Sequence, residues 1–159
     1  MSEILRATIS VPSVTPLGGI QLDVRDDFLL DVQYLAMPVQ QNIPNNPFMH
    51  DLADQVHRYF AGKLHQLDVP MILQGTDFQK RVWRAIAEIP YGHTWTYAEL
   101  ADHVRSGPRA VANACGANRI PLFIPCHRVV AKQGLGGFMQ GRPGGLEIKS
   151  WLLAHEAMH

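Results

Sequence analysis

Residues 96–116, which read TYAELADHVRSGPRAVANACG, decide the fold of the second half of the chain. The Thr-x-x-Glu capping box at its start predicts a helix over residues 97–104. The Ser-Gly-Pro sequence that follows predicts a turn and then a second short helix over residues 109–115. Two short helices joined by a glycine-containing turn are typical of a helix-turn-helix.

The sequence before this stretch predicts where the domains divide. A second capping box, Thr76-x-x-Gln79, predicts a helix over residues 78–89 that Pro90 and Gly92 end. Residues 65–75 have the composition of a linker. We therefore expect an α+β protein, with a small α/β domain over residues 1–70 and a mainly helical, winged-helix-like domain over residues 71–159.

The first domain carries no pattern typical of a catalytic or metal site. Alternating apolar residues over 20–24 and 28–34 predict a β-hairpin, and Asn46-Pro47 opens an amphipathic helix that extends to Leu64. Its histidines lie seven or eight residues apart without a cysteine or carboxylate partner, so we expect no metal site: His50, His57 and His65. A structural role is the prediction for this half.

Composition and charge restrict the class of protein. The chain has 159 residues, 47% of them hydrophobic, and a formal net charge of zero. Residues 1–74 hold four basic and eight acidic residues, and residues 75–159 hold ten basic and six acidic, so the halves carry −4 and +4. The chain has no apolar run of about 18 residues, and its first residues lack the basic-then-apolar pattern of a secretion signal. We therefore expect an intracellular protein without a membrane partner.

The surface between His103 and Leu146 should be electropositive. This range contains no acidic residue and six basic ones, Arg105, Arg109, Arg119, Arg128, Lys132 and Arg142. From charge alone, solvated loop arginines are the favoured interpretation, and a nucleic-acid partner is the alternative.

The predicted helix over 109–115 has unusually small side chains. Only Arg109 and Asn113 could reach base edges, so it is poorly suited to reading sequence in a major groove. Its alanines, Ala110 and Ala112 among them, would let the backbone approach a minor groove closely while Arg109 inserts toward the base stack. Tight packing on a neighbouring helix is an equal alternative.

The apolar segment 120–130 carries a possible nucleophile. We expect it to be extended and buried, with Cys126, His127 and Arg128 in succession. The two basic neighbours would favour the thiolate form of the cysteine, although a buried cysteine is commonly only a small apolar residue. Adjacent side chains of an extended segment point to opposite sides, so Cys126 and His127 would communicate through a bend or a water. Glu156 is the most suitable carboxylate to orient the imidazole.

Six blocks of the second half closely resemble the O6-alkylguanine-DNA alkyltransferases. In order, they are Gly75-Thr76-x-Phe78-Gln79-x-x-Val82-Trp83, Ile89-Pro90-x-Gly92-x-Thr94-x-Thr96-Tyr97-x-x-Leu100-Ala101, Arg109-Ala110-Val111, Asn118, Ile124-Pro125-Cys126-His127-Arg128-Val129 and Gly144-Gly145-Leu146-x-x-Lys149-x-x-Leu152-Leu153-x-x-Glu156. The blocks cover residues 75–156, whereas the first half matches only as a small α/β domain.

The resemblance implies a role for each matching residue. Cys126 would be the alkyl acceptor, His127 would take its proton through a water, and Glu156 would orient His127. Arg109 would fill the gap in the base stack, Tyr97 would help rotate the nucleotide, and Asn118 would brace the turn beside the thiol.

The same resemblance describes the pocket and the partner. The Val129 carbonyl would accept a hydrogen bond from the guanine amino group, Lys149 would lie near the pocket rim, and three further residues would line the pocket: Pro121, Cys115 and Phe138. The partner would be double-stranded DNA containing O6-alkylguanine, contacted in the minor groove by a protein monomer that is consumed after one transfer. No cofactor and no metal are implied, and activity on O4-alkylthymine stays open.

Three other classes compete with this interpretation. A non-enzymatic lesion-binding relative would lack the acceptor cysteine. A Cys/His hydrolase would need to release its intermediate, and a transcription regulator would need a base-reading helix. The expected location is the cytoplasm or nucleoid of a bacterium, or the nucleus of a eukaryote.

Overall fold

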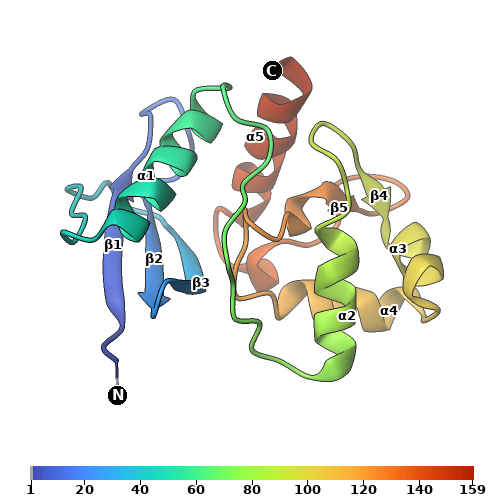
Figure 1. The fold of residues 1–159 in the computed structure, drawn as a ribbon. Helices are drawn as coiled ribbons and strands as arrows, with labels where there is room; N and C mark the ends of the chain where they lie inside the picture. Colours follow the sequence, from blue (N-terminus) through green and yellow to red (C-terminus); the bar gives the residue numbers. More distant parts are fainter. Residues whose placement is uncertain (1) are drawn as a thin grey trace. The chain divides into compact units, whose positions relative to one another are not determined.

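The computed structural model describes residues 2–159, which form two compact units (Figure 1). One contains the chain up to Leu73 together with His159, and the other contains Gln74–Met158. The first unit extends past residue 70 because the Leu29 N–H donates to the Pro70 carbonyl and the Ile72 N–H donates to the Leu29 carbonyl, at 2.9 and 3.0 Å.

A three-stranded antiparallel sheet forms the centre of the first unit. Its order is β1 (Leu5–Ser10), β2 (Gly19–Arg25) and β3 (Phe28–Leu35). The expected hairpin is β2–β3, and β1 is a strand that the sequence analysis did not predict. The apolar–polar alternation that would predict β1 is short, because only Ala7 and Ile9 of this strand are fully buried between polar neighbours.

Helix α1 (Pro47–Phe60) begins where the sequence predicts and ends earlier. The Asn46 side chain accepts a hydrogen bond from the Met49 N–H at 3.1 Å, as an N-cap residue does. The helix stops at Phe60 rather than Leu64 because the chain turns at Gly62, whose φ is +75°.

Three helices of the second unit pack on one another: α2 (Asp77–Ile86), α3 (Tyr97–Val104) and α4 (Pro108–Gly116). Both predicted capping boxes are present, at Thr76 and Thr96. Helix α2 ends at Ile86 instead of residue 89, because the N–H groups of Glu88 and Ile89 bond three residues back and Pro90 has no N–H to continue the helix. The turn between α3 and α4 is three residues long, and its first residue, Arg105, is left-handed.

The remaining elements place the start of α3 beside the segment that holds the thiol. Strand β4 (Trp95–Thr96) pairs in parallel with β5 (Val129–Val130), which directly follows the 3-10 turn η1 (Cys126–Arg128). A second 3-10 turn, η2 (Met139–Gly141), precedes the last helix, α5 (Gly145–Met158). Residues 2–159 contain no antiparallel hairpin after α4, so the expected winged-helix character is limited to the helices.

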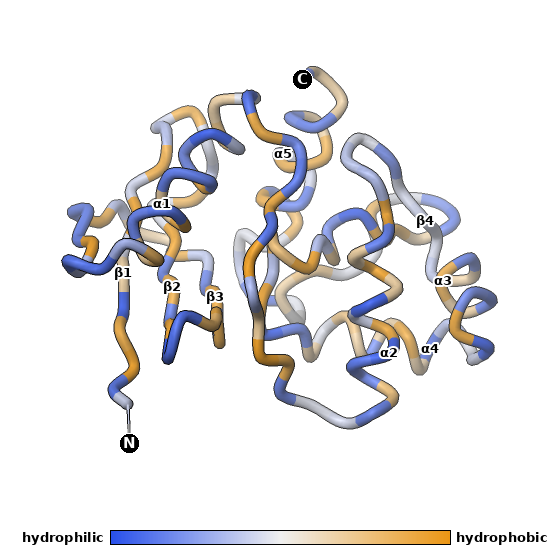
Figure 2. Tube along the Cα trace, viewed as in Figure 1, coloured by the Kyte–Doolittle hydropathy of each residue, from blue (hydrophilic) through white to orange (hydrophobic). Residues whose placement is uncertain are grey.

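The hydropathy pattern explains how α2 packs. Figure 2 shows hydrophilic and hydrophobic residues following each other closely along this helix. Val82, Trp83 and Ile86 are buried, while Arg81 and Arg84 are exposed. No helix within residues 2–159 is both long and apolar enough to cross a bilayer.

Candidate active site

Cys126 lies in a tight turn rather than in an extended segment. The Cys126 N–H donates to the Ile124 carbonyl at 2.7 Å, and the Arg128 N–H donates to the Pro125 carbonyl at 2.9 Å. The expectation of a continuous extended segment is therefore wrong at this point, because Pro125 has a ψ of 64° and turns the chain into η1. The side chain of Cys126 keeps only a small opening, since the residue is 8% exposed.

Asn118 holds the turn that precedes the thiol. Its Nδ2 donates to the Ile124 carbonyl at 3.0 Å, and its Oδ1 accepts from the Ile120 N–H at 2.9 Å. The Asn118 side chain also hydrogen-bonds the Cys126 sulfur. One amide thus fixes both the backbone before the cysteine and the position of the thiol.

Burial controls the ionisation of this thiol. It raises the pKa of Cys126, and the hydrogen bond from Asn118 and the charge of Lys149 offset that rise only in part. The expected thiolate-favouring environment of two basic neighbours is therefore wrong. His127 is neutral, as shown below, and Arg128 pairs with a carboxylate instead. The sulfur is protonated at neutral pH and needs a base before it can act as a nucleophile.

The candidate base is the buried imidazole next to it in the sequence. His127 Nε2 lies 2.7 Å from Glu156 Oε2, and His127 is fully buried. Burial would raise the pKa of Glu156, but the hydrogen bonds from His127 and Arg128 outweigh it and hold the pKa far below its usual range. Burial also lowers the pKa of His127, against the opposite effect of Glu156, so we assign a neutral imidazole.

The tautomer of His127 follows from its partner. An ionised carboxylate only accepts hydrogen bonds, so Nε2 carries the proton and Nδ1 carries a free lone pair. Nδ1 is buried and has no hydrogen-bond partner within residues 2–159. A buried basic nitrogen without a partner in the described chain is suited to accept the proton of a nearby thiol, directly or through a water.

Arg128 completes this network and does not lie on the positive surface that the charge pattern predicts. Its Nε and Nη2 donate to the two oxygens of Glu156 at 2.8 and 3.0 Å, and its Nη1 donates to the Ile89 carbonyl at 2.8 Å. The Tyr91 ring covers the guanidinium, with 5.6 Å between Cζ and the ring centroid. An arginine inside a buried apolar run requires an acidic partner, and that signal was present in the sequence.

Lys149 is buried below the aromatic side chains and does not lie at a rim. It is 0% exposed, and Nζ donates to the Val129 carbonyl at 2.7 Å and to the Gly137 carbonyl at 2.9 Å. The Tyr97 and Phe138 rings lie 5.9 and 5.8 Å from the ammonium. Burial lowers the pKa of Lys149 to about 8.

The other predicted pocket residues lie at different depths. Cys115 is half-buried on α4, and burial together with the nearby Cys126 raises its pKa to about 12. The Val129 carbonyl, expected to face guanine, already accepts from Lys149 and keeps one lone pair for another donor. Pro121 is half-buried in the tight turn closed by the Ile124 N–H and the Ile120 carbonyl.

The predicted DNA-facing residues form a separate group on α4. Arg109 and Asn113 are exposed four residues apart, and Ala110 and Ala112 are half-buried. The opposite face packs inward, where Trp83 Nε1 donates to the carbonyl of the buried Ala114 at 2.8 Å. The packing interpretation is therefore confirmed for the inner face, and the DNA-facing interpretation of the outer face stays a prediction.

Known proteins resemble both the sequence and the structure. Residues 77–158 match the family model described as 6-O-methylguanine DNA methyltransferase, DNA binding domain. The methylated-DNA–protein-cysteine methyltransferase of Methanosarcina barkeri is 40% identical over 149 residues, which are 89% of this chain and 92% of that protein. The protein of the same name from Mycolicibacterium paratuberculosis is 38% identical over 151 residues, or 91% and 90%.

Solved structures of proteins with the same kind of name are also similar to this structure. The Mycobacterium tuberculosis O6-methylguanine methyltransferase superimposes with a TM-score of 0.79 at 35% identity, covering 97% of this chain and 94% of that one. Mycobacterium tuberculosis OGT in complex with DNA gives a TM-score of 0.79 at 37% identity, covering 96% and 92%. With a buried cysteine, histidine and glutamate in the matching blocks, the chain belongs to the methylated-DNA–protein-cysteine methyltransferase family.

Proposed function

We propose that this protein repairs alkylated DNA by moving the alkyl group from O6 of guanine to its own Cys126. The sulfur attacks the alkyl carbon, the new S–C bond forms, and the C–O6 bond breaks with its electron pair moving to the base. The guanine leaves in its normal form after taking up a proton. Because a thioether has no easy leaving route, each molecule acts once.

The observation that carries this proposal is the buried His127 with an unoccupied Nδ1. Nδ1 takes the thiol proton, through a water or directly, and Glu156 stabilises the imidazolium that forms. Arg128 keeps Glu156 ionised by donating to both of its oxygens. The step needs neither a metal nor an organic cofactor, because the sulfur itself supplies the electron pair.

DNA would meet the protein at α4. O6 of guanine lies inside the duplex, so the thiol can reach its substituent only when the nucleotide rotates out of the stack. The exposed Arg109 is placed to fill the gap that remains, and the small residues of α4 allow a close approach in the minor groove. Tyr97 and Phe138, beside Lys149, would enclose the extruded base in a protein monomer.

The second candidate is a protein that binds the lesion without repairing it. The Cys126 thiol and its base argue against this candidate, because recognition alone requires neither. Mass spectrometry separates the two.

After incubation with duplex DNA containing O6-methylguanine, the peptide that contains Cys126 should gain one methyl group, once per molecule. Cys126→Ser should abolish transfer, and the matched variant Cys115→Ser should retain it. Continued transfer by Cys126→Ser, or an unmodified peptide after long incubation of the unsubstituted protein, would contradict the proposal.

A further inference from the structure

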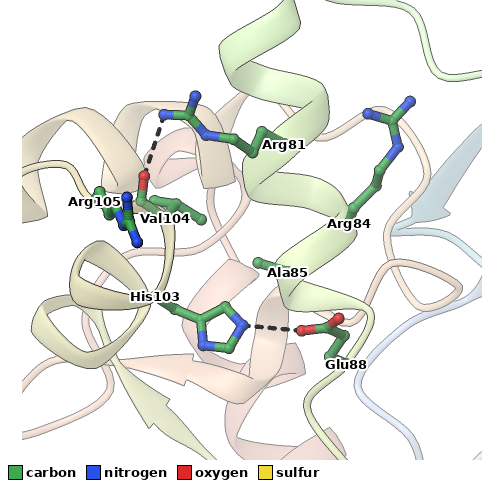
Figure 3. A pocket seen from close by; sticks show the side chains of 7 residues that line it. All are labelled: Arg81, Arg84, Ala85, Glu88, His103, Val104 and Arg105. Atoms are coloured by element: carbon green, nitrogen blue, oxygen red, sulfur yellow. Dashed lines mark hydrogen bonds and ion pairs between the residues drawn. The ribbon is translucent and has the colours of Figure 1, made fainter.

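An open polar groove lies between α2 and α3, away from the thiol. It has a volume of about 540 Å³ and is lined by Arg81, Arg84, Ala85, Glu88, His103, Val104 and Arg105. Figure 3 shows Arg81 and Arg84 projecting from the same helix in different directions, with Arg105 across from Arg81 at the end of α3. The positive charge is therefore spread along the groove rather than concentrated at one point.

Two of the three arginines have no partner within the described residues 2–159. Arg81 donates to the Val104 carbonyl at 3.2 Å and lies over the Phe78 ring. The one acidic residue of the lining, Glu88, is paired with His103 at 3.0 Å. Arg84 and Arg105 make no hydrogen bond or ion pair among the described residues, so their guanidinium groups are free to bind an anion.

The backbone at Arg105 has a conformation that a long side chain does not favour. Arg105 caps α3 with φ 57° and ψ 54°, a left-handed conformation that glycine adopts most easily. A long charged side chain at such a position costs stability compared with glycine. Arg105 also begins the three-residue turn that leads directly into α4.

We propose that the groove of Arg81, Arg84 and Arg105 binds phosphates of the DNA backbone beside the stretch that α4 contacts. This inference rests on the proposed function, because it assumes that α4 faces DNA. An open groove with distributed guanidinium groups fits an extended polyanion better than one small anion. Since phosphates carry no sequence information, the groove would add affinity without base preference, which suits repair in any sequence context.

The test compares a double variant with a matched control of equal charge change. The double variant Arg84→Gln with Arg105→Gly removes both free guanidinium groups, and glycine preserves the left-handed cap. The control, Arg25→Gln with Arg58→Gln, changes two exposed arginines of the first unit. The affinity for an unmodified duplex is measured from low to moderate salt, and transfer to Cys126 is measured with a free O6-alkylguanine base.

We expect the double variant to bind the duplex roughly tenfold more weakly at moderate salt, with a log–log salt slope reduced by about two. The control should match the unsubstituted protein in affinity and in slope. Transfer from the free base should be equal in all three proteins, because it requires no backbone contact.

Three results would overturn the inference. The first is a double variant whose duplex affinity and salt slope are unchanged, and the second is a control that loses as much duplex affinity as the double variant. The third is saturable binding of ATP by the groove with no effect on duplex affinity. If Cys126 of the unsubstituted protein takes no methyl group from duplex DNA containing O6-methylguanine, the proposed function fails instead, and the salt slopes still decide the groove.

Discussion

In the proposed reaction, Cys126 keeps its proton until His127 removes it. Burial raises the pKa of the thiol, while the lone pair of His127 Nδ1 stays available because Glu156 occupies the other ring nitrogen. A nucleophile of this kind is slow toward reagents that need a preformed thiolate, and it becomes active only where the base can reach it.

Thiol labelling measures this property. In a Cys115→Ser background, iodoacetamide should modify Cys126 at about pH 7.5 at least roughly tenfold more slowly in the native protein than in urea. The native rate should continue to rise above pH 9.0, the usual pKa of the group, because the folded pKa is raised. Equal rates in native and unfolded protein at neutral pH would contradict this account.

The sequence identified part of this chemistry and missed the part that depends on α5. Cys126 and His127 are neighbours in a segment whose burial the pattern predicts, and the resemblance adds Glu156. The bonds of Arg128 to Glu156 and of Lys149 to the Val129 carbonyl join residues 20 or more positions apart. Only the packing of α5 shows that the arginine turns away from the thiol and that the lysine is buried.

Helix α4 separates its two tasks by face. Its apolar face packs inward at Val111 and Ala114, and its outer face presents Arg109 and Asn113. Because α4 is short and its other side chains are small, a single arginine would supply most of the length for the proposed insertion into DNA.

Substituting that arginine should distinguish base extrusion from chemistry. Arg109→Ala should slow transfer from duplex DNA by roughly 10- to 100-fold, since the gap left by the extruded base is unfilled and extrusion costs a few kcal/mol. Transfer from a free alkylguanine base should change less than about twofold. Rates for both substrates are measured in single-turnover experiments, with Asn113→Ala as control, and equal losses on the two substrates would remove Arg109 from this role.

Elements with a local signal were predictable, and elements made by distant contacts were not. Both capping boxes depend on residues three positions apart, so the starts of α2 and α3 follow from the sequence. The 3-10 turn at Cys126 depends on the clamp between Asn118 and Ile124, and β1 depends on its pairing with β2. The β-branched composition of residues 120–130 favours an extended chain, and tertiary contacts override it.

The stability of the second unit depends on one buried ion network. Glu156 of α5 joins η1 through His127 and Arg128 and also accepts from the Gly92 N–H at 3.3 Å. The folded pKa of Glu156 lies below its unfolded value, so this contribution is complete above about pH 4.3 and is lost as the pH falls further. The folded pKa of His127 is also lowered, so stability already begins to fall below about pH 6.5.

Removing the counterion should change both the stability and its pH dependence. Arg128→Met should lower the free energy of unfolding by about 3–5 kcal/mol near neutral pH, because it leaves Glu156 buried without its cation. It should also flatten the decline below about pH 4.3, because the pKa of Glu156 is then less depressed, with only the hydrogen bond from His127 left to lower it. The exposed pair His103–Glu88 of the same unit supplies the control, and Glu88→Gln should cost less than about 1 kcal/mol.

Urea unfolding followed by tryptophan fluorescence reports on this unit alone, since Trp83, Trp95 and Trp151 all lie in it. Equal losses in the two variants, or parallel acid profiles, would show that the network does not hold α5 in place.

The narrow opening above Cys126 also bears on how long an unused copy of the protein lasts. A molecule that works once cannot regenerate, so every sulfur lost to a stray oxidant or a freely diffusing electrophile is a repair that never happens. A protonated and nearly buried sulfur protects the standing supply between episodes of damage. Keeping idle copies intact is therefore as much a result of this fold as the reaction itself.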